Sequence, residues 1–98
     1  MIESDVELKK AVQILFPEDA WNSVLKLLVN KCGQQLPLVA NNYVRVQLAV
    51  CKLSNGDAEK LKQHVSVANS DWRDVLVAAG FDSDVNEHIR WLSSLASA

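Results

Sequence analysis

A single glycine, Gly80, separates two amphipathic helical patterns near the carboxyl end of this chain, and it limits the possible folds more than any other residue. The pattern before it opens at Asn69 or Ser70, either of which can cap a helix. Apolar side chains then recur at the i, i+3, i+4 and i+7 spacing of one buried helix face, at Trp72, Val75, Leu76 and Ala79. Because glycine adopts the left-handed conformation at little cost, we expect Gly80 to end this helix, with Phe81 packing back on it.

The pattern after Gly80 predicts a second helix. Asp84 and, three residues later, Glu87 are expected to open it in the manner of a capping box. Its apolar stripe would consist of Val85, Ile89, Leu92 and either Leu95 or Ala96. The two helices define a local architecture, but they match no catalytic, metal-binding or phosphate-binding motif.

Two helices are predicted in the first third of the chain. Ser4 with Glu7 forms a capping box for the first, which ends near Pro17. Its inward residues would be Leu8, Ala11, Val12 and Leu15. The second spans residues 18–32 and stops at Gly33; because its apolar arc is wide, we expect it to be the central helix. That arc comprises Trp21, Val24, Leu25, Leu28, Val29 and Cys32.

Residues 39–53 are open to two interpretations. After a connector at residues 34–37, apolar side chains recur at steps of four and three, at Val39, Tyr43, Val46, Val50 and Leu53, which predicts a long helix. Apolar residues also alternate with other residues over 44–50, a pattern typical of a β-strand. The Leu, Ala, Lys and Gln content favours the helix, and the strand stays as the alternative.

A break at residues 54–56 precedes a fourth helical segment, which Asp57 is expected to cap. Its inward residues would be Ala58, Leu61, Val65 and Ala68. The whole pattern therefore predicts an all-α fold, a compact bundle of five to six short helices, in a single domain over residues 1–98. A chain of 98 residues can bury one modest core, and its apolar content of 49% is ample for that.

The charge of the chain is small but unevenly spread. The net charge is −2, whereas residues 70–98 carry five acidic and two basic side chains. No apolar run approaches the roughly 20 residues of a membrane span, and the first ten residues are too acidic for a signal peptide. We therefore expect a cytoplasmic protein without a membrane partner.

Groups that could carry chemistry are few. Cys32 and Cys51, with eighteen residues between them, have no metal-ligand or redox spacing and are expected to be small buried hydrophobes. His64 and His88 are expected at the surface, and neither lies in a nucleophile, base or zinc pattern. The sequence thus predicts no enzyme, no metal and no cofactor.

Two clusters of polar and aromatic residues are candidates for binding a partner. The first is Trp72, Arg73 and Asp74, and the second is Asp82, Asp84, Glu87, Arg90 and Trp91. Tryptophan and arginine are the usual anchors of protein interfaces, while carboxylates steer basic partners. The plainer interpretation is that the tryptophans belong to the core and the carboxylates favour helix N-termini.

The leading hypothesis is accordingly a small protein–protein interaction module, such as an inhibitor or immunity-type factor or a subunit of a larger assembly. A homo-oligomer is a second option. The alternative from a different class is a helix-turn-helix DNA-binding regulator that uses Lys52, Lys60 and Lys62 for phosphate contacts. We do not expect nucleic acid as a partner, because the last helix brings mainly carboxylates toward the phosphates.

Two stretches of the second half also resemble a family of short, uncharacterised bacterial proteins. Residues 45–57, RVQLAVCKLSNGD, are similar to its R-x-x-L-A-x-x-K-L-x-x-G-D segment, and residues 71–79, DWRDVLVAA, to its D-[YW]-R-D-V-L-x-A-A segment. The resemblance implies an α-helical unit of bacterial or bacteriophage origin and implies no activity. The family often continues into an acidic, aromatic and proline ending, where this chain continues into Gly80, Phe81 and another helix.

Overall fold

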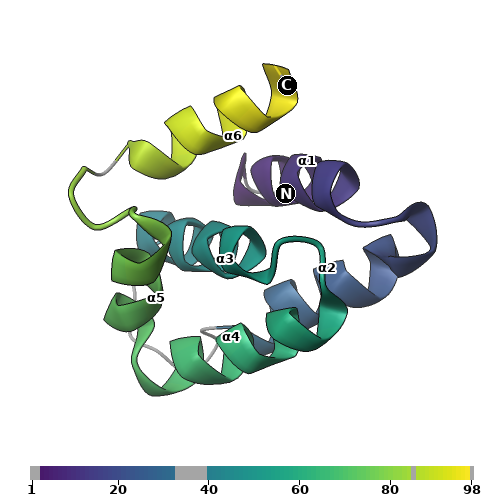
Figure 1. Cartoon of the computed structure of the whole chain (residues 1–98), viewed down its shortest axis with the longest axis horizontal. Helices are drawn as coiled ribbons and strands as arrows, with labels where there is room; N and C mark the ends of the chain where they lie inside the picture. The colour runs from purple at the N-terminus through teal and green to yellow at the C-terminus, as the bar shows by residue number, and fades with distance from the viewer. Residues whose placement is uncertain (1–2, 33–39, 85, 98) are drawn as a thin grey trace.

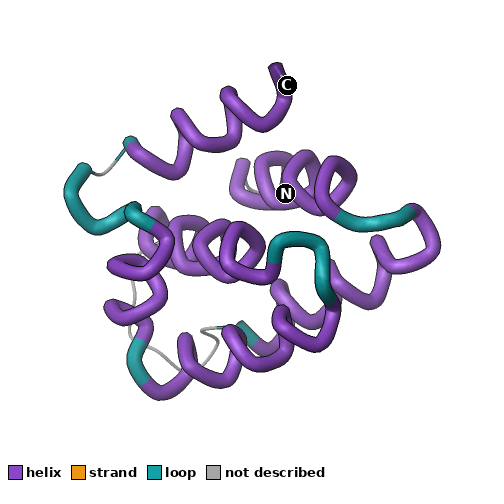
Figure 2. Tube along the Cα trace, in the orientation of Figure 1, coloured by secondary structure: helices purple, strands orange, loops and turns teal. Residues whose placement is uncertain are grey.

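The computed structural model describes residues 3–32, 40–84 and 86–97, and these form a compact all-α bundle (Figure 1). Figure 2 shows helices and loops, without a strand, over those ranges. The elements in chain order are α1 (Glu3–Leu15), the short 3-10 helix η1 (Glu18–Ala20), α2 (Trp21–Lys31), α3 (Ala40–Ser54), α4 (Ala58–Ser70), α5 (Trp72–Ala79) and α6 (Glu87–Ser97). The predicted fold class is confirmed.

The central element is α3, which contacts α1, α4, α5 and α6. Nearly every side chain between Val44 and Cys51 is buried, with Arg45 half-buried. A helix that is covered on all sides shows no clear polar face, and this explains why residues 44–50 also matched the alternation of a strand. The helical alternative was correct. The prediction that residues 18–32 form the central helix was wrong, because α2 packs at the edge of the bundle with Val29 exposed.

One hydrophobic core is shared by all six α-helices. Its most completely buried large side chains are Leu8, Val12, Leu28, Val46, Leu48, Val50, Leu61, Val75 and Phe81. A buried hydrogen bond from the Gln47 side chain to the Leu28 carbonyl, at 3.1 Å, joins α3 to α2. The Asn69 amide donates to the Lys31 carbonyl at 2.8 Å and links the ends of α4 and α2.

Helix ends agree only partly with the predictions. Since α1 begins at Glu3, Ser4 lies inside the helix instead of preceding it. Pro17 has extended backbone angles before η1, and the Trp21 indole donates to the Phe16 carbonyl at 2.8 Å across this corner. Gly33, the connector at 34–37, Val39 and Val85 lie outside the described residues.

The start of α4 follows the prediction closely. The Asp57 carboxylate accepts from the backbone N–H groups of Glu59 and Lys60 at 2.9 and 3.3 Å, as an N-cap residue should. Of the four residues predicted to face inward, Leu61, Val65 and Ala68 are buried. Ala58 is exposed, so that part of the prediction was wrong.

The junction between α4 and α5 differs from the prediction. Asn69 and Ser70 belong to the last turn of α4, and Asp71 is both the C-cap of α4 and the N-cap of α5. The Asp71 side chain makes no capping hydrogen bond to α5. The two helices are therefore joined through a single residue, because α4 continues through both residues expected to cap its successor.

No helix within the described ranges is long and apolar enough to cross a membrane.

Candidate functional site

The eight candidate partner-binding residues lie at the two ends of α5. Trp72, Arg73 and Asp74 form its first turn, while Asp82, Asp84, Glu87, Arg90 and Trp91 follow its last residue. An eight-residue helix is about 12 Å long, so the structure separates the candidates into two groups. Figure 1 shows α5 along one edge of the bundle, between the α4–α5 junction and the loop that leads to α6.

The α5–α6 corner begins with a helix ending of the predicted kind. Gly80 has φ +79, in the left-handed region. Its N–H donates to the Val77 carbonyl at 3.0 Å, and the Phe81 N–H donates to the Leu76 carbonyl at 2.8 Å. These two bonds are those of a Schellman motif. The Phe81 side chain is only 1% exposed, which confirms that it packs back on the core.

Two cationic side chains of α3 donate hydrogen bonds to carbonyl groups at this corner. The Arg45 guanidinium donates to the Phe81 carbonyl at 2.6 Å, and the Lys52 ammonium donates to the Ala79 carbonyl at 2.7 Å. The Lys52 ammonium also lies 5.1 Å from the centre of the Phe81 ring. Positive charge stabilises the carbonyl end of a helix. The sequence analysis missed this role, although residues 45 and 52, two helical turns apart, necessarily lie on one face of α3.

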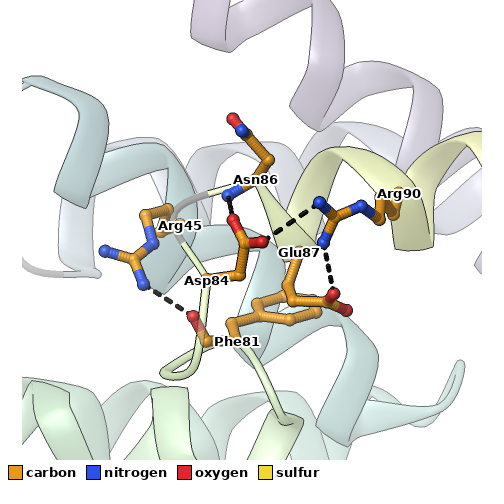
Figure 3. A network of polar contacts seen from close by, with 6 residues as sticks. All are labelled: Arg45, Phe81, Asp84, Asn86, Glu87 and Arg90. Carbon is orange, nitrogen blue, oxygen red and sulfur yellow. Dashed lines mark hydrogen bonds and ion pairs between the residues drawn. The ribbon is translucent and has the colours of Figure 1, made fainter.

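Arg90 pairs with two of the three carboxylates at the corner (Figure 3). The Asp84 carboxylate accepts from the backbone N–H of Asn86 at 2.8 Å and lies 3.0 Å from Arg90. The pKa of Asp84 is lowered by the Asn86 hydrogen bond first and by Arg90 second. The pKa of Arg90 is raised, chiefly by its hydrogen bonds to Glu87 and Asp84.

This pairing changes the electrostatic character expected of the corner. The predicted capping box at Asp84 was wrong, because α6 begins at Glu87, the Asp84 carboxylate accepts from the N–H of Asn86 just before the helix, and Glu87 directs its carboxylate to Arg90. Asp82 is exposed, and no ion pair joins it to another residue in the described part of the chain. Of the three carboxylates, Asp82 is therefore the one whose charge is not offset locally.

The orientation of α6 corrects two predictions. His88 was expected at the surface and is only 6% exposed, whereas Ile89 was expected in the core and is 40% exposed. Leu92 is buried as predicted. Because Leu92 lies between His88 and Ile89 around the helix axis, the difference amounts to a rotation of about 50°. Tertiary contacts decide it, because α6 packs on α1 and α3 while Phe81 lies against both the His88 ring, at 6.3 Å, and the Trp91 ring, at 5.8 Å.

Both candidate tryptophans are half-buried and pack against the core. Trp91 contacts Phe81, as described above, and the Arg73 guanidinium lies 5.3 Å from the centre of the Trp72 ring. Each side chain is thus partly core and partly surface. Neither of the two interpretations of the tryptophans was complete.

The side of α5 that faces away from the bundle consists of the exposed residues Arg73, Asp74, Val77 and Ala78, which we call the α5 outer face. Val77 is 58% exposed, the highest value for a large hydrophobic side chain among the described residues. The sequence analysis did not single it out. The sequence feature that could have identified Val77 is its position four residues after Arg73 and outside the inward apolar stripe of α5.

The titratable groups inside the bundle are not arranged for chemistry. Cys32 and Cys51 are free thiols in the core, and burial raises the pKa of Cys32 to about 12 and raises that of Cys51 as well. Such thiols are poor nucleophiles at neutral pH. Within the described residues, no cluster of three His, Cys, Asp or Glu side chains could hold a metal ion.

The geometry of α5 and α6 also bears on the helix-turn-helix alternative. In that motif two helices joined by a turn of three or four residues pack on each other, whereas here residues 80–86 intervene and α6 packs chiefly on α1. Lys52 was assigned to DNA phosphates and instead binds the end of α5. Lys60 and Lys62 are exposed on α4, where Lys62 lies 3.6 Å from Glu59.

Comparison with protein-family models, with curated proteins and with solved structures finds no match to this chain.

Proposed function

We propose that this chain is a small helical module that binds another protein through the α5 outer face. The observation that carries the proposal is the exposure of Val77, which lies on the same face as Arg73 and between the two groups of candidate residues. Contiguous apolar surface rimmed by polar residues marks interaction sites, and Val77 with the adjacent exposed Ala78 forms the apolar part of this face. The partner class includes a target that the module inhibits and a larger assembly of which it is a subunit.

The anchors of this surface would be Trp72 and Arg73. The Arg73 guanidinium already lies 5.3 Å from the centre of the Trp72 ring, so little side-chain entropy would be lost when a partner covers them. Covering Val77 would contribute on the order of 1 kcal/mol from apolar burial. Trp72 and Arg73 are of the residue types that dominate binding energy at interfaces, which supports placing them near the centre of the contact.

Electrostatic steering would come from Asp74 and Asp82. Asp84 and Glu87 are largely offset by Arg90, so they contribute less than their number suggests. Arg90 and Trp91 would lie at the edge of the contact. A basic partner should associate more slowly with an Asp82→Lys variant at low salt, because exposed charges act mainly on the association rate.

The test compares two variants that introduce the same charge on different helices. Val77→Glu changes the α5 outer face, and Val67→Glu changes α4 at a valine that is 37% exposed. Each tagged protein is used for pull-downs from host lysate, with and without nuclease. We expect a stoichiometric, nuclease-resistant protein partner with the native chain and Val67→Glu, and its loss with Val77→Glu.

Two results would contradict the proposal. Equal recovery with both valine variants would exclude the α5 outer face, and recovery of nucleic acid alone would favour the helix-turn-helix alternative. Light scattering of the purified protein covers the homo-oligomer option, since a dimer formed through this face should dissociate in Val77→Glu only.

A cytoplasmic location and a bacterial or bacteriophage origin belong to the same proposal. Two free, buried cysteines are typical of proteins from reducing compartments, which supports the location. The origin rests on the resemblance of residues 45–57 and 71–79 to the bacterial family. No enzymatic activity, metal or cofactor is part of the proposed function.

A further inference from the structure

His88 occupies an unusual place for its chemistry. It is 6% exposed on α6, and its Nδ1 atom has no hydrogen-bond partner in the described part of the structure. Burial of a polar atom without a partner is costly. The next residue, Ile89, is 40% exposed, so a large part of its apolar surface remains in water. The helix therefore packs with a polar ring inward and an adjacent apolar side chain outward.

The sequence of α6 can support a second arrangement. The observed inner side includes His88 and Leu92, whereas the apolar spacing of the sequence places Ile89 and Leu92 on one side. Both arrangements bury Leu92, which lies between His88 and Ile89 around the helix axis, so a rotation of about 50° would turn His88 outward and Ile89 inward.

We propose that α6 is a pH-sensitive element with two positions, one with His88 inside and one with Ile89 inside, and that protonation of His88 favours the second. The neutral ring can remain beside Phe81, at 6.3 Å. The protonated ring would carry a buried charge near Arg45, which is itself cationic. Exchange of His88 for Ile89 would return that charge to water and bury an apolar side chain instead.

Each element packed against α6 contributes known charges. From α3, Arg45 is the group that acts on His88; from the preceding loop, Asp84 is paired with Arg90, and Asp82 is exposed. On α6 itself, Glu87 is paired with Arg90. On α1, Glu7 is half-buried, and the two lysines at positions 9 and 10 are exposed. The positive charge of Arg45 thus opposes protonation in the observed position.

The direction of the pH effect follows from the pKa of His88, which is lowered by burial first and by Arg45 second. With His88 inside, the protein binds fewer protons than with His88 exposed. The observed position is therefore fully favoured above the pKa of an exposed histidine, about 6.5, and loses stability as the pH falls below that value. Each tenfold preference of the inner site for the neutral ring lowers its titration midpoint by about one pH unit.

The experiment is an NMR titration of the whole chain between pH 8 and pH 5. At pH 8 we expect contacts between the rings of Phe81 and His88. Below about pH 6.5 we expect these contacts to disappear and contacts between Phe81 and the Ile89 methyl groups to replace them. The amide signals of α4 should not change, because the exchange is confined to α6 and to the helices it packs on, α1 and α3.

Two variants and one control separate this exchange from general acid unfolding. His88→Leu should keep the observed position at all pH values, and Ile89→Gln should weaken the second position, so that acid loosens α6 without new core contacts. His64→Gln removes the other histidine and should leave the transition intact. Contacts between Phe81 and His88 that persist at pH 5, or loss of all helices in one step with α6, would overturn the proposal.

Discussion

Two turns in the described part of this protein contain a glycine in the left-handed conformation, and they differ in what surrounds that glycine. Gly56, between α3 and α4, has φ +84, and a Cβ atom there would lie 2.7 Å from the Leu15 carbonyl oxygen at the end of α1. Gly80, between α5 and α6, has φ +79, and a Cβ atom there would meet nothing within 4 Å. The first turn is pressed against another helix, whereas the second is open.

The comparison separates two reasons for a glycine. At Gly80 only the backbone angle requires it, a reason that is visible in the local sequence. At Gly56 a close approach of backbone from a distant part of the chain requires it as well. The α3–α4 turn is therefore part of the packed bundle, while the α5–α6 corner depends on hydrogen bonds from side chains of α3 and leaves its outer side to solvent.

The largest effect should come from Gly56→Ala. The left-handed angle costs about 1 to 2 kcal/mol for a residue with a Cβ atom, and the collision with the Leu15 carbonyl adds an overpacking term of similar size. We expect a loss of about 3 kcal/mol in the free energy of unfolding, measured by urea denaturation. Gly56→Asn should be no milder, because its Cβ atom meets the same oxygen.

A smaller loss, about 1 kcal/mol, is expected for Gly80→Ala, because only the backbone angle opposes the new side chain. Gly80→Asn should recover part of it, since asparagine tolerates the left-handed region. The same urea series measures both. If Gly56→Ala and Gly80→Ala proved equally destabilising, the distinction between a packed and an open turn would fail.

The Lys52→Met variant tests whether side chains of α3 stabilise the α5–α6 corner. The change removes the hydrogen bond to the Ala79 carbonyl but keeps the length of the side chain. We expect a loss of about 1 kcal/mol, near the lower end for bonds to charged groups because Lys52 is partly solvated. Lys60→Met on α4 is the control and should leave the unfolding midpoint unchanged. Hydrogen exchange should quicken at the Gly80 and Phe81 amides in Lys52→Met only.

The smallest effect is expected for Arg90→Ala. Arg90 pairs with Asp84 and Glu87 at the surface, where ion pairs contribute little to stability. The unfolding midpoint should remain within error of the native value. The pKa of Asp84 should rise on loss of Arg90 but stay below its ordinary value, because the Asn86 N–H bond is retained. NMR titration of the Asp84 carboxyl carbon measures this; an unchanged pKa would show that the backbone bond acts alone.

The predictions from sequence succeeded where a feature depends on neighbouring residues. The N-cap at Asp57, the helix ending at Gly80 and the return of Phe81 were all confirmed. Each is a contact within a few positions along the chain, so its signal lies in a short window. The all-α class follows from the same kind of signal, summed over six helices.

The predictions failed where tertiary packing decides which helix is central or which side of a helix is buried. The wide apolar arc of residues 18–32 predicted that they form the central helix. The central helix is instead α3, in which even the polar side chain of Gln47 is buried, because it donates a hydrogen bond to the Leu28 carbonyl. On α6 the apolar stripe pointed to Ile89, and packing placed His88 inside instead. In both cases a polar side chain is buried within a helix, and no rule of helical spacing predicts that.

For the candidate partner-binding surface, the residue types in the sequence predicted which kinds of side chain are present but not which of them lie together. Trp72 and Arg73 do lie together, as neighbours in one turn must. Two of the three carboxylates at the α5–α6 corner, Asp84 and Glu87, proved to be paired with Arg90, and the exposed Val77 was found only in the folded structure. Charge counts along a chain cannot show which charges pair, because pairing depends on side-chain directions.

By itself the sequence determined the helices, the helix ends at Asp57 and Gly80 and the all-α class of this protein, since those features depend on backbone preferences and periodicity within a few turns. Only the tertiary structure decided that α3 is central, that α6 packs with His88 inward, and that Arg45 and Lys52 hold the α5–α6 corner. The contact between Arg45 and Phe81 joins residues 36 positions apart, and the contact between α1 and α6 joins helices that are still farther apart in the sequence. Such contacts are selected by the packing of the whole bundle, and no local segment contains them.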